Sequence, residues 1–374
     1  MQDVIASGMF TMGHHVAAFE QAFARQFGAR HAVMVNSGSS ANLLAVAALF
    51  YRRERPLQRG EEVIVPAVSW STTYYPLHQY GLKLKFVDID PATLNYDLSA
   101  LAEAVSDKTR MIVAVNLLGN PNDFSAIDAI VAGRDIVLIE DNCESMGATY
   151  AGRQAGTFGL IGTFSSFFSH HISTMEGGVA VTDDEELYHI LLSLRAHGWT
   201  RNLPTRNRVC SDKSDDWFEE SFRFVLPGYN LRPLELSGAI GIEQLKKLPD
   251  FVRARRENAA SFKALMTRYP HFQTQAEIGE SSWFGFSLVV RSDAPFSRKD
   301  VLRRFAEYGI ETRPIVTGNF TKNEVVKRWF DYAIHDTLPN ADWIDRNGFF
   351  IGNHQYLLDE QFEVLRQALD HFKG

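Results

Sequence analysis

The sequence predicts an α/β protein, in which a large domain with a mostly parallel mixed sheet covered by helices is followed by a smaller C-terminal α+β domain. Over the first two thirds of the 374 residues, apolar runs of strand type alternate with segments of helical spacing. This alternation favours a parallel sheet with helices on both faces. From about Leu248 the pattern changes to charged helices around one further strand. We therefore place the two domains at residues 1–247 and 248–374.

The individual elements follow the chain in order. Short apolar runs rich in Val and Ile predict buried strands at residues 31–35, 61–68, 84–90, 111–119, 135–141 and 284–291. Apolar residues three and four positions apart predict helices at residues 15–27, 39–53, 98–105, 124–133, 251–269, 298–310 and 360–372. Residues 225–248 are typical of an irregular loop that leads into a helix.

The composition argues against several classes of function. The net charge is −7 and no stripe of Lys and Arg occurs, so nucleic acid and anionic membranes are not expected as partners. No apolar run approaches the roughly 18 residues of a membrane span, and the N-terminal MQDVIASGMF lacks the features of a signal peptide. Two cysteines, Cys143 and Cys210, cannot build a disulfide framework. We therefore expect a reducing, cytoplasmic compartment.

A turn of small residues, NSGSSAN at 36–42, lies between a predicted strand and a predicted helix. Free backbone N–H groups at a helix start, together with the helix dipole, favour a bound anion such as a phosphate group. Ser and Asn are also good helix caps. A plain capping turn is therefore an equally good interpretation of this stretch alone.

Acidic residues end one predicted strand, in LIEDNCESMGA at 138–148. Glu140 and Asp141 stand at its carboxyl end, where ligands of open α/β sheets bind. Such a carboxylate can hold a metal, a ribose or a ring nitrogen, but a capping or salt-bridged acid explains the pattern equally well. Trp70, in VPAVSWSTTYYP at 65–76, also follows a strand. It can stack on a planar cofactor, although a core aromatic is the commoner use.

A histidine pair, His170 and His171, precedes a Met-Glu-Gly-Gly turn and an apolar strand-like run in SFFSHHISTMEGGVAV at 166–181. No HExxH or Cys/His spacing accompanies the pair, so no metal is expected. The eleven lysines leave a gap between Lys108 and Lys213. An enzyme that binds an aldehyde cofactor covalently on this kind of sheet needs a lysine after the acidic strand end, and this chain has none there.

The motifs SGSSAN, PAVSW, EDNCESMGA, FSSFFSHHISTMEGG and PGYNLR, in this order, resemble the sugar-nucleotide aminotransferase family. That family consists of pyridoxal phosphate (PLP) enzymes with the aspartate-aminotransferase fold, also called fold type I, and the resemblance implies this fold over essentially the whole chain. The resemblance begins within the first few residues, so we expect an N-terminal segment of longer relatives to be missing here. In the family a lysine lies six residues before the glutamate of the Glu-Gly-Gly turn. Counting back from Glu176 gives His170.

The resemblance also assigns residues to the cofactor. Asp141 corresponds to the acid that pairs with the pyridine nitrogen and keeps the ring protonated, so that the ring can accept electrons. Trp70 corresponds to the aromatic side chain that stacks on the ring. Gly38, Ser39 and Ser165 correspond to the phosphate ligands.

Further assignments concern the partner subunit and the substrate. Asn230 corresponds to a residue that reaches the phosphate from the partner subunit, which implies a homodimer with shared active sites. Glu144 stands where many relatives carry Gln or His, and is assigned a part in holding the cofactor. Arg232 corresponds to a residue for the carboxylate of the amino-acid donor, and Ser169 and His197 are placed with it on the substrate side.

The histidine at position 170, with SHHISTMEGG, RAHGWTRNLP and RPIVTGNF, is similar to one branch of the family. That branch removes the C3 hydroxyl of GDP-4-keto-6-deoxy-D-mannose on the route to colitose, a 3,6-dideoxysugar of lipopolysaccharide O-antigens. Imidazole cannot hold PLP covalently as lysine does, but it is a base near neutral pH. The resemblance implies that L-glutamate converts PLP to pyridoxamine phosphate (PMP), whose amine condenses with the C4 ketone. His170 would then move the protons as the C3 hydroxyl leaves, giving GDP-4-keto-3,6-dideoxy-D-mannose and ammonia.

Other functions remain open at this point. A sugar-nucleotide 4-aminotransferase would leave a 4-amino sugar, and the missing lysine argues against it. A non-catalytic sensor of PLP or a nucleotide sugar could keep the fold, but the retention of Asp141, Trp70 and Ser165 argues against that. An iron–sulfur relative needs clustered cysteines, and this chain has two that lie far apart in sequence. No motif in the sequence indicates how the nucleotide base is recognised. The assignment of GDP as the nucleotide therefore depends on the resemblance alone.

Overall fold

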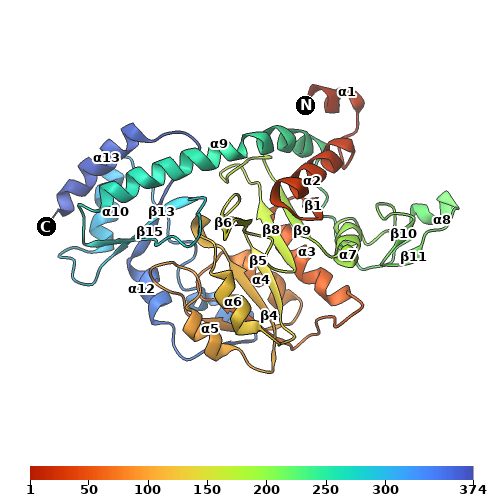
Figure 1. Cartoon of the computed structure of the whole chain (residues 1–374), viewed down its shortest axis with the longest axis horizontal. Helices are drawn as coiled ribbons and strands as arrows, with labels where there is room; N and C mark the ends of the chain where they lie inside the picture. Colours follow the sequence, from red (N-terminus) through yellow and green to blue (C-terminus); the bar gives the residue numbers. More distant parts are fainter. Residues whose placement is uncertain (374) are drawn as a thin grey trace.

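The computed structural model describes residues 1–373, and an eight-stranded sheet forms its centre (Figure 1). The strands lie in the order β1-β9-β8-β5-β4-β2-β3-β14. Their bounds are β1 His31–Val35, β2 Glu62–Pro66, β3 Lys83–Val87, β4 Thr109–Val115, β5 Val137–Asp141, β8 Ile161–Ser165, β9 Gly178–Thr182 and β14 Tyr332–Ile334. Neighbouring strands are parallel except at β9, which is antiparallel to β1 and β8. The predicted mostly parallel mixed sheet is confirmed.

Helices cover both faces of this sheet because its central strands are apolar on both sides. Strands β8 and β9 are buried throughout, and β2 and β5 are buried apart from their first residue, as is usual for sheets of α/β proteins. One face packs against α3, α4 and α7, and the other against α2, α5, α6 and part of α9. The bounds are α2 His14–Phe27, α3 Gly38–Tyr51, α4 Ser71–Gln79, α5 Leu98–Ala104, α6 Phe124–Val131 and α7 Glu185–Arg195.

The long helix α9, Glu235–Met266, passes through the position of the predicted domain boundary. The sequence pattern suggested two separate helices around Leu248, whereas the helix continues through Pro249. A proline inside a helix removes one backbone hydrogen bond. Here Leu245 and Val252 are buried in a cluster with side chains of α2 and the sheet, and this packing holds the helix together at that point. The predicted division into two domains stays a prediction.

A second hydrophobic cluster occupies the C-terminal third of the chain. It surrounds an antiparallel sheet in the order β12-β13-β15. Its elements are β12 Phe272–Thr274, β13 Gly285–Val290, β15 Gly348–Gly352, α10 Arg298–Glu307 and α13 Asp359–Leu369. The chain between α10 and β15 returns to the large sheet, where β14 pairs with β3. Helices α11 Glu324–Trp329 and α12 Pro339–Asn347 flank β14 in sequence.

Several shorter elements belong to neither the eight-stranded sheet nor the three-stranded sheet. They are α1 Gln2–Ser7, the hairpin β6 Thr149–Tyr150 and β7 Arg153–Gln154, and a segment made of β10 Arg206–Asn207, β11 Ser211–Asp212 and α8 Trp217–Ser221. The segment with α8 projects from the body of the molecule (Figure 1). Within residues 1–373, no helix combines the length and the apolar character needed to cross a membrane.

The sheet topology brings the predicted site residues to one edge. Strands β1, β2, β5 and β8 run in the same direction, so their carboxyl ends meet at one edge, where ligands of such sheets bind. Asp141 and Ser165 are the last residues of β5 and β8. Gly38 begins the helix after β1, and Trp70 precedes the helix after β2.

Candidate active site

The turn after β1 forms a cradle, Ser37–Ser40, at the N-terminus of α3. Ser37 caps the helix, because its Oγ accepts a hydrogen bond from the Ser40 N–H (3.1 Å). A Cβ on Gly38 would lie 2.7 Å from the Cβ of Ser165 and 3.0 Å from the Sγ of Cys143. Two predicted phosphate ligands therefore approach each other at a helix N-terminus, and such an arrangement binds anions.

We expect Gly38→Ala to weaken PLP binding by about tenfold or more. The added methyl group has no free space beside Ser165, and overpacking of this kind costs about 1–3 kcal/mol. Titration of the apoprotein with PLP, followed by absorbance, measures the Kd. The control is Gly352→Ala, because Gly352, like Gly38, has no left-handed backbone φ, and its new Cβ would meet only the Nε2 of His354, at 4.0 Å. An unchanged Kd for Gly38→Ala would show that the phosphate binds elsewhere.

Asp141 is held by three hydrogen-bond donors. Its Oδ2 accepts from the Nδ2 of Asn42 (2.8 Å) and from the Oγ1 of Thr73 (2.7 Å). Its Oδ1 accepts from the backbone N–H of Cys143 (3.2 Å). These bonds fix the orientation of a carboxylate at the end of a strand, which is what recognition of one ring nitrogen requires.

Glu140 faces the opposite side of β5, because successive side chains of a strand alternate. Its carboxylate is buried and accepts hydrogen bonds from the N–H groups of Gly156 (2.6 Å) and Gly159 (2.7 Å). Burial raises the pKa of this carboxyl group, although the hydrogen bonds oppose that change. Glu140 therefore shapes the turn before β8, whereas Asp141 points to the other face of β5, toward Asn42 and Thr73.

Trp70 leaves much of its indole open, with 56% of the residue exposed. An open aromatic face is what stacking on a planar ring requires. Thr72, in the first turn of α4, connects that helix to the cradle, because its Oγ1 lies 2.8 Å from the Oγ of Ser39. Trp70, which immediately precedes α4, is therefore close in the chain to a residue bonded to the predicted phosphate ligand Ser39.

Glu144 lies in the turn after β5, and its Oε2 accepts a hydrogen bond from the Leu118 N–H (3.0 Å). Burial first, and then the negative charge of Asp141, raise the pKa of Glu144 to about 7, against the opposing effect of the Leu118 hydrogen bond. Near neutral pH a substantial share of Glu144 is therefore protonated. A protonated carboxyl group can donate a hydrogen bond to an oxygen of a bound ring.

The raised pKa of Glu144 predicts a pH-dependent stability of the apoprotein. The folded chain keeps this proton up to about pH 7, whereas the unfolded chain releases it near 4.5. The free energy of unfolding therefore falls as the pH rises between these values. Glu144→Gln cannot ionise, so it should stabilise the protein more at about pH 8 than at about pH 5. Thermal unfolding at both pH values checks this, and an equal change in Tm at the two would contradict it.

His170 lies in the turn after β8, where the resemblance expects a lysine. Its ring packs against those of Phe284 and Phe167, with ring centroids 5.1 and 5.9 Å away. Burial, and then the charge of Arg255, lower the pKa of His170 to about 4. The imidazole is therefore neutral near pH 7, and a neutral imidazole can accept a proton.

His171 points to a different environment. The residue is 1% exposed, and its Nε2 lies 3.2 Å from the carbonyl oxygen of Ser282. Because a carbonyl oxygen can only accept, Nε2 carries the hydrogen in this contact. His171 is thus part of the protein interior, and His170 is the less buried histidine of the pair.

The predicted substrate-side residues are more open. Ser169 and Asn230 are exposed, and Arg232 and His197 are partly exposed. The Oδ1 of Asn230 accepts a hydrogen bond from the Nε of Arg232 (3.0 Å), and the His197 N–H donates to the carbonyl of Tyr229 (2.5 Å). Asn230, Arg232 and the backbone of His197 therefore lie close together. The assignment of Asn230 to the phosphate of a partner subunit stays a prediction.

The sequence analysis missed Asn42 and Thr73, the two side chains that orient Asp141. Both are buried polar residues on helices, 8% and 3% exposed. A polar side chain in an otherwise apolar helix such as α3 is the signal that could have identified Asn42, because buried polar groups need a hydrogen-bond partner.

One group within residues 1–373 has the residue types and spacing of a metal site: His14, His15 and Glu235. The Glu235 carboxylate accepts hydrogen bonds from the N–H groups of Gly13 (2.6 Å), His15 (2.6 Å) and Val16 (3.2 Å). The carboxylate therefore caps the start of α2, where free N–H groups and the helix dipole attract an anion. This capping explains the cluster without a cation.

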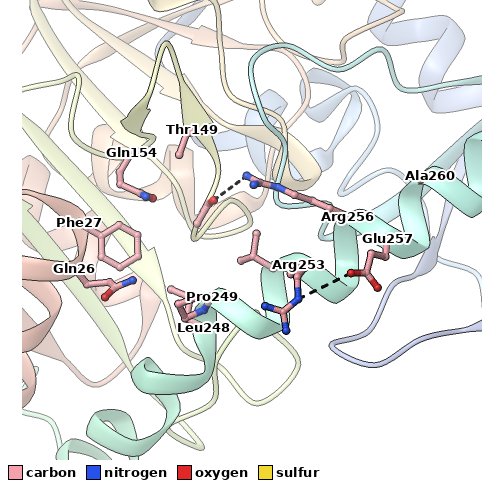
Figure 2. A pocket seen from close by; sticks show the side chains of 12 residues that line it. Gln26, Phe27, Thr149, Gln154, Leu248, Pro249, Arg253, Arg256, Glu257 and Ala260 are labelled. Atoms are coloured by element: carbon pink, nitrogen blue, oxygen red, sulfur yellow. Dashed lines mark hydrogen bonds and ion pairs between the residues drawn. The ribbon is translucent and has the colours of Figure 1, made fainter.

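A separate cavity of about 520 Å³ is lined by the end of α2, the β6–β7 hairpin and α9 (Figure 2). Arg253 and Arg256 reach it from α9, and Gln154 reaches it from the hairpin. Arg253 pairs with Glu257 (4.0 Å), and the Nη2 of Arg256 donates to the carbonyl of Gly147 (3.4 Å). No residue assigned to the cofactor or the substrate lines this cavity, so it is distinct from the candidate active site.

Comparison with known proteins places this geometry in a family. The model of the DegT/DnrJ/EryC1/StrS aminotransferase family matches residues 1–369. The chain is 60% identical over 369 residues to the GDP-4-keto-6-deoxy-D-mannose 3-dehydratase of Escherichia coli O55:H7 (strain CB9615 / EPEC), with 99% of this chain and 95% of that protein covered. It is also 60% identical over 369 residues to the protein of the same name from Yersinia pseudotuberculosis, with coverage of 99% and 94%.

The solved structures agree with these matches. A crystal structure of GDP-4-keto-6-deoxymannose-3-dehydratase with a trapped PLP–glutamate geminal diamine has a TM-score of 0.97 and 60% identity to this chain. The match covers 98% of this chain and 95% of that one. The predicted aspartate-aminotransferase-like fold is therefore confirmed.

Proposed function

Because the chain belongs to the DegT/DnrJ/EryC1/StrS aminotransferase family, we propose that it is a PLP- and PMP-dependent 3-dehydratase of a nucleotide sugar. Its substrates are GDP-4-keto-6-deoxy-D-mannose and L-glutamate. Its products are GDP-4-keto-3,6-dideoxy-D-mannose, 2-oxoglutarate and ammonia. The observation that carries the proposal is His170 in place of the lysine, in a chain 60% identical to two proteins named for this reaction.

The described residues fit the cofactor. Its phosphate would lie against the cradle, where Gly38 leaves space beside Ser165. Trp70 would stack on the ring, Asp141 would pair with the ring nitrogen, and Glu144 would donate a hydrogen bond to a ring oxygen. When bound, the cofactor supplies an amine for the C4 ketone and a conjugated ring that accepts electrons.

His170 performs the proton transfers in this proposal. As a neutral imidazole it accepts a proton from the carbon through which the cofactor is joined to the sugar, and it then donates that proton to the departing C3 hydroxyl. The lowered pKa of His170, about 4, keeps the resting imidazole neutral and makes the protonated form a good acid. Since His170 stands in place of the lysine that would recapture the cofactor covalently, water completes the turnover and releases ammonia.

The remaining assigned residues bind the amino-acid donor and the phosphate of the cofactor. Arg232 binds a carboxylate of glutamate, with Ser169 and His197 beside it, and Asn230 of each subunit serves the phosphate site of the other. The homodimer is supported by the projecting segment with α8, where Trp217, Phe218 and Phe222 are 77%, 74% and 71% exposed, because a contiguous exposed apolar patch marks an interaction surface. We place the reaction in the cytoplasm, on the route to colitose.

The test is a single incubation of the purified protein with PLP, glutamate and GDP-4-keto-6-deoxy-D-mannose. Ammonia is assayed, and the sugar nucleotide is analysed by mass spectrometry. We expect glutamate-dependent ammonia release and a sugar that has lost one oxygen. Omission of glutamate is the control, because PMP cannot then be regenerated.

Other outcomes would identify other functions. A stable 4-amino sugar without ammonia would show a sugar-nucleotide aminotransferase and would contradict the proposal. A PLP absorbance that glutamate leaves unchanged, together with tight binding of the sugar nucleotide, would indicate a non-catalytic sensor. If no product forms from the GDP sugar, the same incubation with the CDP, UDP and dTDP sugars tests whether the assigned nucleotide is wrong.

A further inference from the structure

Among residues 1–373, the Nδ1 of the His170 imidazole lacks a polar partner that would orient the ring. A histidine base is usually oriented by a hydrogen bond to its second ring nitrogen. The Nδ1 of His170 is instead buried without a hydrogen-bond partner in the part of the chain that is described. The orientation of this ring therefore depends on packing, and the two aromatic rings that pack on it are those of Phe167 and Phe284.

Phe284 ends a short stretch, Ser282–Phe284, that we call the junction segment because it leads into β13. The Phe284 N–H donates to the carbonyl of Leu118 (3.0 Å). A Cβ on Gly119 would lie 2.4 Å from the backbone nitrogen of Trp283, so the two stretches meet backbone to backbone. The loop that binds Glu144 through Leu118 thus also fixes the position of Phe284.

Trp283, in the middle of the junction segment, has a backbone φ of 49°. This left-handed conformation is strained for a bulky residue, and it persists only where the surroundings enforce it. Arg255 on α9 supplies such a contact, because its Nη1 donates to the carbonyls of Trp283 (3.3 Å) and Phe284 (3.1 Å). Arg255 is 2% exposed, so these bonds are made in the interior.

His171 connects the junction segment to the turn that carries His170. Its Nε2 donates to the Ser282 carbonyl (3.2 Å), and its ring centroid lies 5.8 Å from that of Phe284. The residue beside the proposed base is therefore bonded to the same segment whose aromatic ring packs on that base. Of the two adjacent histidines, His171 is bonded to the junction segment, whereas His170 packs against the aromatic ring of that segment.

We propose that His171 and Phe284 are positioning residues for His170. His171 anchors the turn after β8 to the junction segment, and Phe284 supports the imidazole in its reactive orientation. Arg255 holds the junction segment in the strained conformation that presents Phe284 to the ring. The inference rests on the role of His170 in the proposed function.

Two pairs of variants of the full-length protein test it. His171→Leu removes the donor to Ser282 while His171→Gln keeps one, and Phe284→Ala removes the ring while Phe284→Tyr keeps it. We expect His171→Leu and Phe284→Ala to lower kcat for ammonia release by about tenfold or more, because a misplacement of about 1 Å can cost about 100-fold. The KM for the sugar nucleotide and the Kd for PLP should stay within about twofold. The Gln and Tyr variants should recover at least about a third of kcat.

A second measurement does not depend on turnover. Carbethoxylation of His170 by diethyl pyrocarbonate, followed by mass spectrometry, should be at least about threefold faster in His171→Leu and Phe284→Ala than in the wild type, because the ring is released. His189→Leu removes another buried histidine, on α7, and is the control for a general loss of stability. If His171→Leu does not fold, the Phe284 pair decides the test.

The two measurements separate the possible failures. If the wild type does not dehydrate the sugar but the variants still expose His170, the proposed function is wrong and the positioning stands. If kcat and carbethoxylation both equal the wild-type values, the positioning role is overturned. A fall in kcat that Gln and Tyr do not rescue, with unchanged carbethoxylation, would also overturn it, since it would show a general structural effect.

Discussion

Replacement of His170 by lysine is expected to abolish dehydration and to attach the cofactor covalently to the protein. A lysine amine at this position can form a covalent C=N bond with the aldehyde carbon of PLP. The burial that lowers the pKa of His170 also favours an uncharged, nucleophilic amine. We expect ammonia release to fall by at least about 100-fold, which is within the usual contribution of a general acid–base group. Borohydride reduction and mass spectrometry should then find the cofactor attached at residue 170.

The control for this variant is His170→Asn, which offers neither a base nor a covalent anchor. It should lose dehydration to a similar extent, but its PLP should remain removable by dialysis. The comparison separates the loss of the base from the trapping of the cofactor. A lysine variant that dehydrates within about tenfold of the wild type would contradict the proposed role of His170.

The sequence predicted most of the large sheet because parallel strands that are buried on both faces are apolar at nearly every position, as β2 and β5 are. It did not predict β14, which has three residues and pairs with β3 across a long stretch of sequence. A strand this short shows no periodicity. The helix that continues through Pro249 was missed for a related reason, since the packing that holds it comes from α2, far away in the chain.

The candidate site was predicted from position and resemblance, because the motifs with Gly38, Trp70 and Asp141 each follow a strand. Local sequence pattern alone could not show which of two adjacent residues faces a ligand, and only the resemblance selected Asp141 and His170. Glu140 is turned away by the N–H groups of the turn before β8, and His171 is turned away by the Ser282 carbonyl. These partners lie 16 to 111 positions away in sequence, so no local pattern indicates the choice.

Asp141→Asn is expected to lower the rate of both half-reactions by about 10- to 150-fold, if Asp141 pairs with the ring nitrogen. Hydrogen bonds to charged groups contribute about 1.5–3 kcal/mol, and each 1.36 kcal/mol in the barrier changes the rate about tenfold. The amide carries no charge with which to keep the ring nitrogen protonated, so the ring becomes a poorer electron acceptor. Rapid-mixing absorbance of the PLP-loaded protein with glutamate measures the first half-reaction, and ammonia release measures the whole turnover.

Glu140→Gln is the matched control, because it neutralises the neighbouring carboxylate on the same strand. Its amide must meet the N–H groups of Gly156 and Gly159, which now donate to the Glu140 carboxylate, so we expect a lower Tm. The rate per folded molecule should stay near the wild-type value, since Glu140 faces away from the site. Asp141→Asn should show the reverse pattern, with chemistry lost and most of the stability kept. If the two variants lose rate and stability in the same proportion, the Asp141 carboxylate has a structural role and its assignment to the ring nitrogen is wrong.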